Sequence, residues 1–459
     1  MTWPLMLSAF SKSASLPIAS YHRILSPDFP EFINKYVDLP ILQRLSGIGL
    51  LCGTDWTPLY RNRFFYSRLD HSIGVALILW HFTHERAETL AGLLHDVSTP
   101  VFSHVADFRN GDALTQESTE NENESMIRND DALCAMLKSD GISIDAVADY
   151  HVYPLADNKL PRLSADRLEY MFPSGAALEG SWTLSEIAEA YGDIAICINE
   201  GGERELGFRT QKIAETYCEK TCRTGHILQL NENKLALKLL SDIVDRAIAI
   251  GLIAEKDCYE KTELEIVARF DSFSESVQSE NAANDTVHGE AEVCGDLYGG
   301  DAVGDNRDAI RDASRNVRTA SDTAHGSVHA AASRNPPASS NAHTASGTAR
   351  KDFPDATACP SSSAFSPQEE FIKRWRTFRT MTRIEHTDDA LPDHFCVSLD
   401  VKMRYIDPLV IGDGESAAGA RRLTSVSKKS AALIEDFLSW RDTKYGCATY
   451  ADKNRSRPG

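Results

Sequence analysis

The chain has 459 residues, of which 42% are hydrophobic, and its formal net charge is −19 at pH 7. This length and composition can support one large or two smaller domains with a hydrophobic core. No apolar run reaches the roughly 18 residues of a membrane-spanning helix, so we expect no membrane segment. The acidic surface would repel a polyanion, which argues against a nucleic-acid partner but not against a small phosphorylated ligand.

The first residues and the cysteines bear on localisation. Residues 1–20 lack the basic segment that opens a signal peptide, so we expect a mobile leader. The ten cysteines include no C-x-x-C pair, and Cys218 and Cys222 are expected on one helix rather than in a zinc site. This cysteine usage is typical of a reducing compartment and predicts a cytoplasmic protein.

Residues 21–273 are expected to form a helical core. Apolar residues recur at helical spacing from Leu39 to Leu51, with Pro40 near the first turn of that helix. The stretch SWTLSEIAEAYGDIAICINE predicts a helix followed by a strand. Two long amphipathic helices are predicted at ELGFRTQKIAETYCEKTCRTGHILQL and KLALKLLSDIVDRAIAIGLI, and ELEIVARF follows as a short final helix.

Two helix-period apolar patterns between Tyr66 and Phe108 predict an antiparallel helix pair within this core. Thr83 is expected to cap the second helix, and Pro100 stops it.

The geometry of this pair suggests a metal site. The legs 71–83 and 84–96 would each be about 18 Å long, so His71 returns to the end that carries His95 and Asp96. Two imidazoles and a carboxylate at one end of a helix pair can bind a divalent cation.

A fourth ligand is available at Asp166, where SADRLEYMF opens another helical stretch. Two neutral nitrogens and two carboxylates suit Mn, Fe, Ni, Mg or Zn, and the share of oxygen ligands favours a six-coordinate ion. The spacing alone also fits core histidines with satisfied nitrogens and an aspartate that ends a helix. A site for one divalent ion is therefore a hypothesis beside that structural alternative.

The composition changes in residues 274–366, which are rich in Ala, Ser, Asp, Asn, Gly and Thr and poor in large apolar residues. Burial in such a stretch cannot offset the chain entropy, so we expect a long disordered insert. Residues 367–450 are expected to form a small α+β subdomain, and 451–459 a tail. In that subdomain, FIKRWRTFRTMTRI predicts either a surface helix with one apolar stripe or an anion-binding patch.

Four motifs follow one another between residues 40 and 175: LQRLSGIGL, SRLDHSIGV, AGLLHDVSTPVFSH and SADRLEY. Together they resemble the HD-domain metal-dependent phosphohydrolases, and most closely the deoxynucleoside triphosphate triphosphohydrolase branch. The resemblance implies a mainly α fold built on an HD-domain helical core. It also implies one divalent ion held by His71, His95, Asp96 and Asp166.

The resemblance further implies roles for residues around the ion. Arg68 matches an arginine that binds substrate phosphate, Arg167 matches a basic phosphate-contacting position, and Tyr170 matches a tyrosine that lines the substrate pocket. His104 and Asp107 match polar active-site positions. We expect His104 to bind the phosphate or to protonate the leaving group, and Asp107 to orient it.

The chain also departs from that branch. Thr99 and Asn121 stand where the branch has histidines, and Pro173–Ser174 replace an arginine–aspartate pair. The predicted ion site is complete, while the acid–base equipment is reduced. The leading hypothesis is a divalent-metal phosphohydrolase that acts on a nucleotide or on another small phosphorylated metabolite. The nucleotides considered include deoxynucleoside triphosphates. The alternative is a non-catalytic nucleotide sensor that keeps metal and phosphate binding. The sequence does not decide between a monomer and a homo-oligomer.

Overall fold

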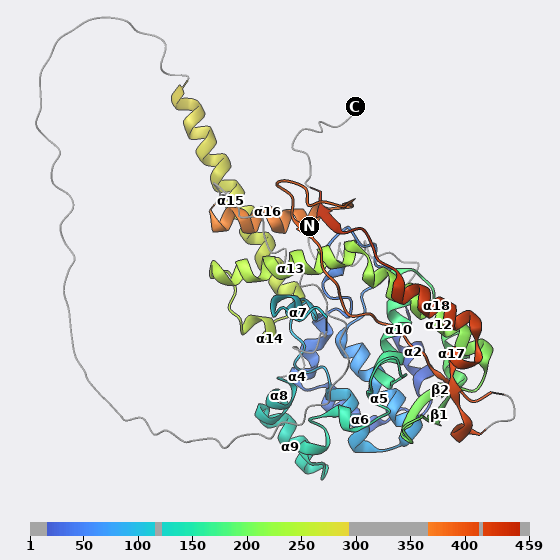
Figure 1. The fold of residues 1–459 in the computed structure, drawn as a ribbon. Helices are drawn as coiled ribbons and strands as arrows, with labels where there is room; N and C mark the ends of the chain where they lie inside the picture. The colour runs from blue at the N-terminus through green and yellow to red at the C-terminus, as the bar shows by residue number, and fades with distance from the viewer. Residues whose placement is uncertain (1–15, 115–121, 293–365, 413–415, 450–459) are drawn as a thin grey trace, which may run out of the picture. The chain divides into compact units, whose positions relative to one another are not determined.

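Helices dominate the computed structural model, which describes residues 16–114, 122–292, 366–412 and 416–449, with side chains left out for 278–292. The mainly α fold expected from the sequence is confirmed (Figure 1). The described residues up to 279 and from 366 to 449 belong to one compact unit, and of residues 280–355 the structure describes only the end of one helix. Within the described ranges, no helix is both long and apolar enough to cross a bilayer.

The predicted antiparallel pair consists of α5 (Arg68–Thr83) and α6 (Arg86–Leu94). A Cβ atom at Gly92 would lie 2.4 Å from the Leu79 side chain, so a glycine is needed for the two helices to approach this closely. The pair therefore brings the start of α5 and the end of α6 to the same side.

The ends of the pair are set by local capping. Ser67 and Asp70 form a capping box at the start of α5, and α5 ends where His84 takes a left-handed conformation at φ 53°. The predicted cap at Thr83 is wrong, because Thr83 is the last residue of α5 and Glu85 precedes α6 with no side-chain cap bond.

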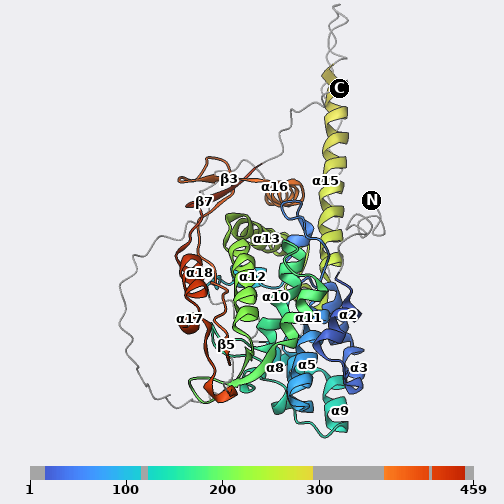
Figure 2. The same ribbon diagram turned by 90° about the vertical axis from the view of Figure 1, so that its right-hand side faces the viewer.

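The described residues also contain other α-helices. They are α2 (Ile18–Leu25), α3 (Asn34–Val37), α4 (Pro40–Gln43), α7 (Val105–Arg109), α8 (Asn123–Asn129), α9 (Asp131–Ser139), α10 (Ala165–Leu178), α11 (Leu184–Gly192), α12 (Gln211–Gln229), α13 (Asn231–Ala249), α14 (Asp257–Glu260), α15 (Glu263–Glu292), α16 (Pro367–Thr380), α17 (Leu423–Val426) and α18 (Lys428–Ser439). Besides α6, α5 contacts α2 and α10, and α13 packs against α7 and α16 (Figures 1 and 2).

Two helices differ in length from their predictions. The helix expected over 39–51 is only α4 followed by a 3-10 turn that ends at Gly47, because Ile48 is extended. The helix expected at ELEIVARF instead continues as α15 past Phe273, where the disordered insert was expected to begin. No glycine or proline interrupts the sequence between Phe273 and Val287, so helical propensity can carry the helix onward. Residues 293–365 lie outside the described part of the chain.

Two small sheets complete the unit. In the first, β1 (Ile194–Ile198) pairs antiparallel with β2 (Arg204–Phe208), β2 pairs parallel with β5 (Leu409–Val410), and β5 pairs antiparallel with β6 (Arg421–Arg422). In the second, β7 (Tyr445–Ala448) lies between β3 (Ile384–Thr387) and β4 (Cys396–Val397), antiparallel to both. The segment expected as a C-terminal subdomain thus contributes two strands, β5 and β6, to the sheet that begins with β1 and β2.

A disulfide joins Cys396 to Cys447, which are paired residues of β4 and β7. The expectation of reduced cysteines is therefore wrong for this pair. Cys218 and Cys222 lie on one helix, α12, as predicted, and both are free.

Candidate metal centre

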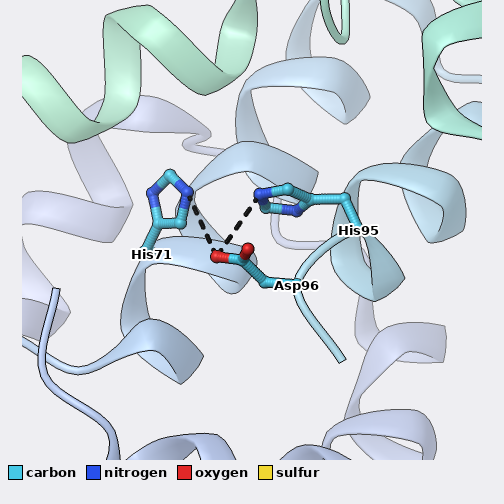
Figure 3. Close-up of side chains that lie close together, drawn as sticks. All are labelled: His71, His95 and Asp96. Atoms are coloured by element: carbon cyan, nitrogen blue, oxygen red, sulfur yellow. Dashed lines mark ion pairs between the residues drawn. The ribbon is translucent and has the colours of Figure 1, made fainter. Parts of the chain in front are cut away.

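Four side chains meet at the open end of the helix pair. His71 lies in the first turn of α5, His95 and Asp96 directly follow α6, and Asp166 lies in the first turn of α10. Nε2 of His71 lies 3.7 Å from Oδ2 of Asp96 and 3.1 Å from Oδ1 of Asp166. Nε2 of His95 lies 3.6 and 3.8 Å from the same two oxygens. Figure 3 shows both imidazole rings turned toward the Asp96 carboxylate.

These separations suit one coordination sphere. Zinc and magnesium form bonds of about 2.0–2.2 Å to nitrogen and oxygen, which puts neighbouring ligand atoms roughly 3–4 Å apart. His71, His95 and Asp96 form a cluster that can hold a metal ion, and Asp166 reaches both imidazoles from a third helix. The structure thus brings together all four ligands that the sequence predicted.

Hydrogen bonds at the opposite ring nitrogens orient both imidazoles. Nδ1 of His71 donates to Oε2 of Glu169 over 2.5 Å, and Nδ1 of His95 donates to the carbonyl of Gly92 over 2.7 Å. Each histidine then turns its Nε2 atom toward the site. The fully buried Glu169 carboxylate is held in turn by the hydroxyls of Tyr21 and Tyr66, at 3.1 and 2.6 Å.

The charges of the site also prepare it for a cation. Burial would raise the pKa of the Asp96 carboxyl, but Arg68, His95 and His71 outweigh burial and hold it well below its usual range. The pKa of Asp166 is lowered in the same way, against burial, by His71. Burial would lower the pKa of His71, but Glu169 and Asp166 raise it to about 10. Both carboxylates are thus charged at neutral pH, and a cation at Nε2 of His71 would displace a proton.

Arg68 and Thr99 hold the Asp96 carboxylate from two sides. Nη1 of Arg68 donates to Oδ2 over 2.9 Å, and Nε of Arg68 donates to Ser103 over 3.1 Å. The Thr99 hydroxyl donates to Oδ1 over 2.9 Å. Thr99, which stands where the resembled branch has a histidine, therefore fixes the carboxylate of a predicted metal ligand.

His104 lies just before α7, as a neutral imidazole that accepts a hydrogen bond at Nε2. Its Nδ1 donates to Oδ2 of the buried Asp107 over 2.8 Å, and its Nε2 accepts from Nη2 of Arg404 over 3.4 Å. Burial lowers the pKa of His104, and the charges of Arg404 and Arg68 lower it further. Asp107 orients His104 as expected. In this form, however, His104 can accept a proton and cannot donate one from Nε2.

Backbone strain surrounds His104. Phe102 and Ser103 take left-handed conformations at φ 62° and 51°, which are costly for residues other than glycine. The Phe102 amide donates to the buried Glu263 carboxylate over 3.2 Å, and the Ser103 hydroxyl donates to the Gly49 carbonyl over 3.0 Å. These contacts hold the strained loop that presents His104.

The two other predicted substrate-binding residues differ in what their side chains contact. Both line the same pocket as the metal ligands. The Arg167 guanidinium contacts Asp157 over 3.0 Å and also donates to Asn158. These contacts fix it in the wall of the pocket. Tyr170 lies beneath the Arg404 guanidinium, 5.6 Å from it. Asn121 lies outside the described residues.

Sequence reasoning missed Glu169 and Arg404. Glu169 stands three residues after Asp166, which places it on the same helix face and could have marked it. Arg404 and Lys402 also line the pocket, and their spacing of two in the sequence is that of residues on one side of a strand. No local signal links them to a site some 300 residues earlier in the chain.

Comparison with known proteins concerns the fold more than the activity. No family model matches the chain. It is 32% identical over 131 residues to the uncharacterised protein YdhJ of Bacillus subtilis, a match that spans 28% of this chain and 38% of that protein. The fold is similar to that of a hypothetical protein from Aquifex aeolicus, with a TM-score of 0.50 and 11% identity over 91% of this chain and 92% of the other. A phosphohydrolase from Bacteroides thetaiotaomicron gives a TM-score of 0.48 and 11% identity over 92% and 96%. At such identity, the likeness to the Aquifex protein shows the fold alone.

Proposed function

We propose that this chain is a divalent-metal-dependent phosphohydrolase of the HD-domain type, acting on a nucleotide or another small phosphorylated metabolite. The observation that carries the proposal is the meeting of two imidazole Nε2 atoms and two carboxylates in a pocket that Arg68 also lines. This mixed nitrogen and oxygen set suits Mn, Fe, Ni, Mg or Zn.

The charge of the pocket supports an anionic substrate. Among the described residues that line it, three are carboxylates (Asp96, Asp157 and Asp166) and four are cationic (Arg68, Arg167, Lys402 and Arg404). A divalent ion would add two positive charges. The pocket is thus locally positive in a chain whose net charge is −19, which favours a phosphorylated ligand over a neutral one.

Each side chain has a role in this proposal. A divalent ion held by His71, His95, Asp96 and Asp166 would polarise a phosphoryl oxygen and lower the pKa of bound water. Arg68, fixed by its bonds to Asp96 and Ser103, binds phosphate oxygens next to the ligands.

His104 moves the proton in this scheme. Its Nε2, which accepts from Arg404 in the structure, would take a proton from the attacking water. Asp107 holds the ring in the tautomer that this step needs. The leaving-group acid expected from the sequence thus acts first as a base.

One observation favours the rival function of a nucleotide sensor. Thr99 uses its hydroxyl to fix Asp96, and a hydroxyl cannot supply the proton transfer of the histidine that it replaces. A protein of this kind would bind the ion and the phosphate without turnover.

Purified protein assayed with a panel of nucleoside mono-, di- and triphosphates, deoxy forms included, and with Mn²⁺, Ni²⁺ and Mg²⁺ separates the two functions. The proposal predicts product from at least one ligand and its loss in Asp166→Asn. Binding without product would favour the sensor, and neither binding nor product would overturn both.

A further inference from the structure

We propose that Arg404 is a substrate-binding residue of this pocket and that it holds phosphate oxygens beside His104. The inference rests on the proposed function and adds to the site a part of the chain beyond the HD motifs. Arg404 lies in a stretch without regular secondary structure between β4 and β5, some 240 residues after Asp166.

The side chain of Arg404 lies inside the pocket. It lines the same cavity as the four metal ligands, and its Nη2 donates to Nε2 of His104 over 3.4 Å. The guanidinium also lies over the Tyr170 ring, 5.6 Å from its centre. The aromatic face orients the planar guanidinium.

The backbone that delivers Arg404 is fixed at several points. A Cβ atom at Gly225 would lie 2.6 Å from the Arg404 carbonyl oxygen, so the glycine lets this stretch lie directly on α12. The Lys402 carbonyl accepts from Gln229 over 2.9 Å, and the Lys402 amide donates to the Ala113 carbonyl over 3.3 Å. The stretch is therefore held before a ligand arrives, which lowers the entropy cost of binding.

A phosphate fits this position better than the imidazole does. The bond from Arg404 to His104 is longer than the usual 2.7–3.2 Å of an N–H donor, and its acceptor is neutral. A phosphate oxygen offers a charged acceptor and can bind two guanidinium N–H groups at once. When Arg404 turns to the phosphate, Nε2 of His104 is released to face the ligand. Arg404 thus couples phosphate binding to the availability of His104.

Binding of inorganic phosphate to the Mn²⁺-loaded full chain tests this role independently of turnover. Calorimetry should show that Arg404→Ala weakens phosphate binding by about 10- to 100-fold, the value of a hydrogen bond to a charged group. The metal content should stay at the wild-type level. Arg404→Lys should recover part of the affinity because it keeps the charge without the planar fork.

Arg383→Ala is the matched control, since Arg383 is exposed and does not line the pocket. If Arg404→Ala folds, keeps its metal and binds phosphate as the wild type does, the inference is wrong. If the wild type binds phosphate but hydrolyses nothing, the proposed reaction fails while the role of Arg404 is still decided by the same titration. If the wild type binds no phosphate, both are overturned. With an active substrate, Arg404→Ala should raise KM more than it lowers kcat.

Discussion

The Nδ1 atom of His71 donates to Oε2 of Glu169 over 2.5 Å, in a position where both side chains are almost completely buried. This bond decides which ring nitrogen of His71 faces the site. Gly74 makes the contact sterically feasible, because a Cβ atom there would lie 2.5 Å from the Glu169 carboxylate. The ion site thus depends on a carboxylate that need not touch the ion.

Glu169→Gln should weaken divalent-ion binding by about 10- to 100-fold, because the amide orients His71 less firmly and removes the buried charge behind it. Titration with Mn²⁺ by calorimetry measures the effect. Glu385→Gln, at an exposed position of β3, is the control and should bind as the wild type does. Equal Mn²⁺ affinities in the two variants would show that Glu169 contributes to packing and not to ion binding.

His104→Ala should lower kcat by about 10²–10⁴-fold, the usual contribution of general acid–base catalysis, while the ion stays bound. Steady-state kinetics measures the change in kcat, and elemental analysis of the same preparation measures the bound ion. A variant that loses its ion together with its activity would show that His104 supports the ligands and not the chemistry.

The pH profile of kcat/KM should retain activity below pH 6.5. The pKa of His104 is lowered from the ordinary 6.5, so the neutral form that accepts a proton persists to more acidic pH and is lost only below that lowered pKa. Because Arg404 contributes to this lowering, Arg404→Gln should move the acid limb of the profile to higher pH. A profile that falls as the pH rises through 6.5 would instead require a protonated imidazole, contrary to the proposed base.

Reduction of the bond between Cys396 and Cys447 should lower the free energy of unfolding by about 2–4 kcal/mol, because the bond closes a long loop in the unfolded chain. Denaturant unfolding of Cys396→Ser against Cys134→Ser, whose cysteine is free, isolates this effect from the loss of a thiol. The metal content should not change, and equal stability of the two variants would contradict the role of the bond.

The sequence anticipated those parts of the site that local geometry determines. The sequence predicted that His71, His95 and Asp96 lie at one end of the helix pair, because helix rise and a short turn fix their separation. Asp166 required an added motif, since nothing local places α10 against α5. Arg404 could not be anticipated, because its approach depends on Gly225 and on sheet pairing far along the chain.

In the fold, too, local features could be predicted from the sequence and features that depend on distant parts of the chain could not. The helix pair was predicted with its turn slightly misplaced. The left-handed His84 follows the end of α5, and the residue that precedes α6 is Glu85, two residues after the predicted cap Thr83. The pairing of Cys396 with Cys447 depends on the register of β4 against β7, which separate stretches of sequence do not specify. The continuation of α15 past Phe273 fits helical propensity, which composition alone cannot distinguish from disorder.

The central claim is that an ion held by His71, His95, Asp96 and Asp166 is needed to hydrolyse a phosphate ester. The most direct test measures phosphate-ester hydrolysis before chelation, after chelation and after Mn²⁺ is restored, with elemental analysis at each step and His95→Ala in parallel. We expect about one ion per wild-type chain, loss of hydrolysis on chelation and its return with Mn²⁺, and no return in His95→Ala. Hydrolysis at an undiminished rate by protein shown to be free of metal would contradict it.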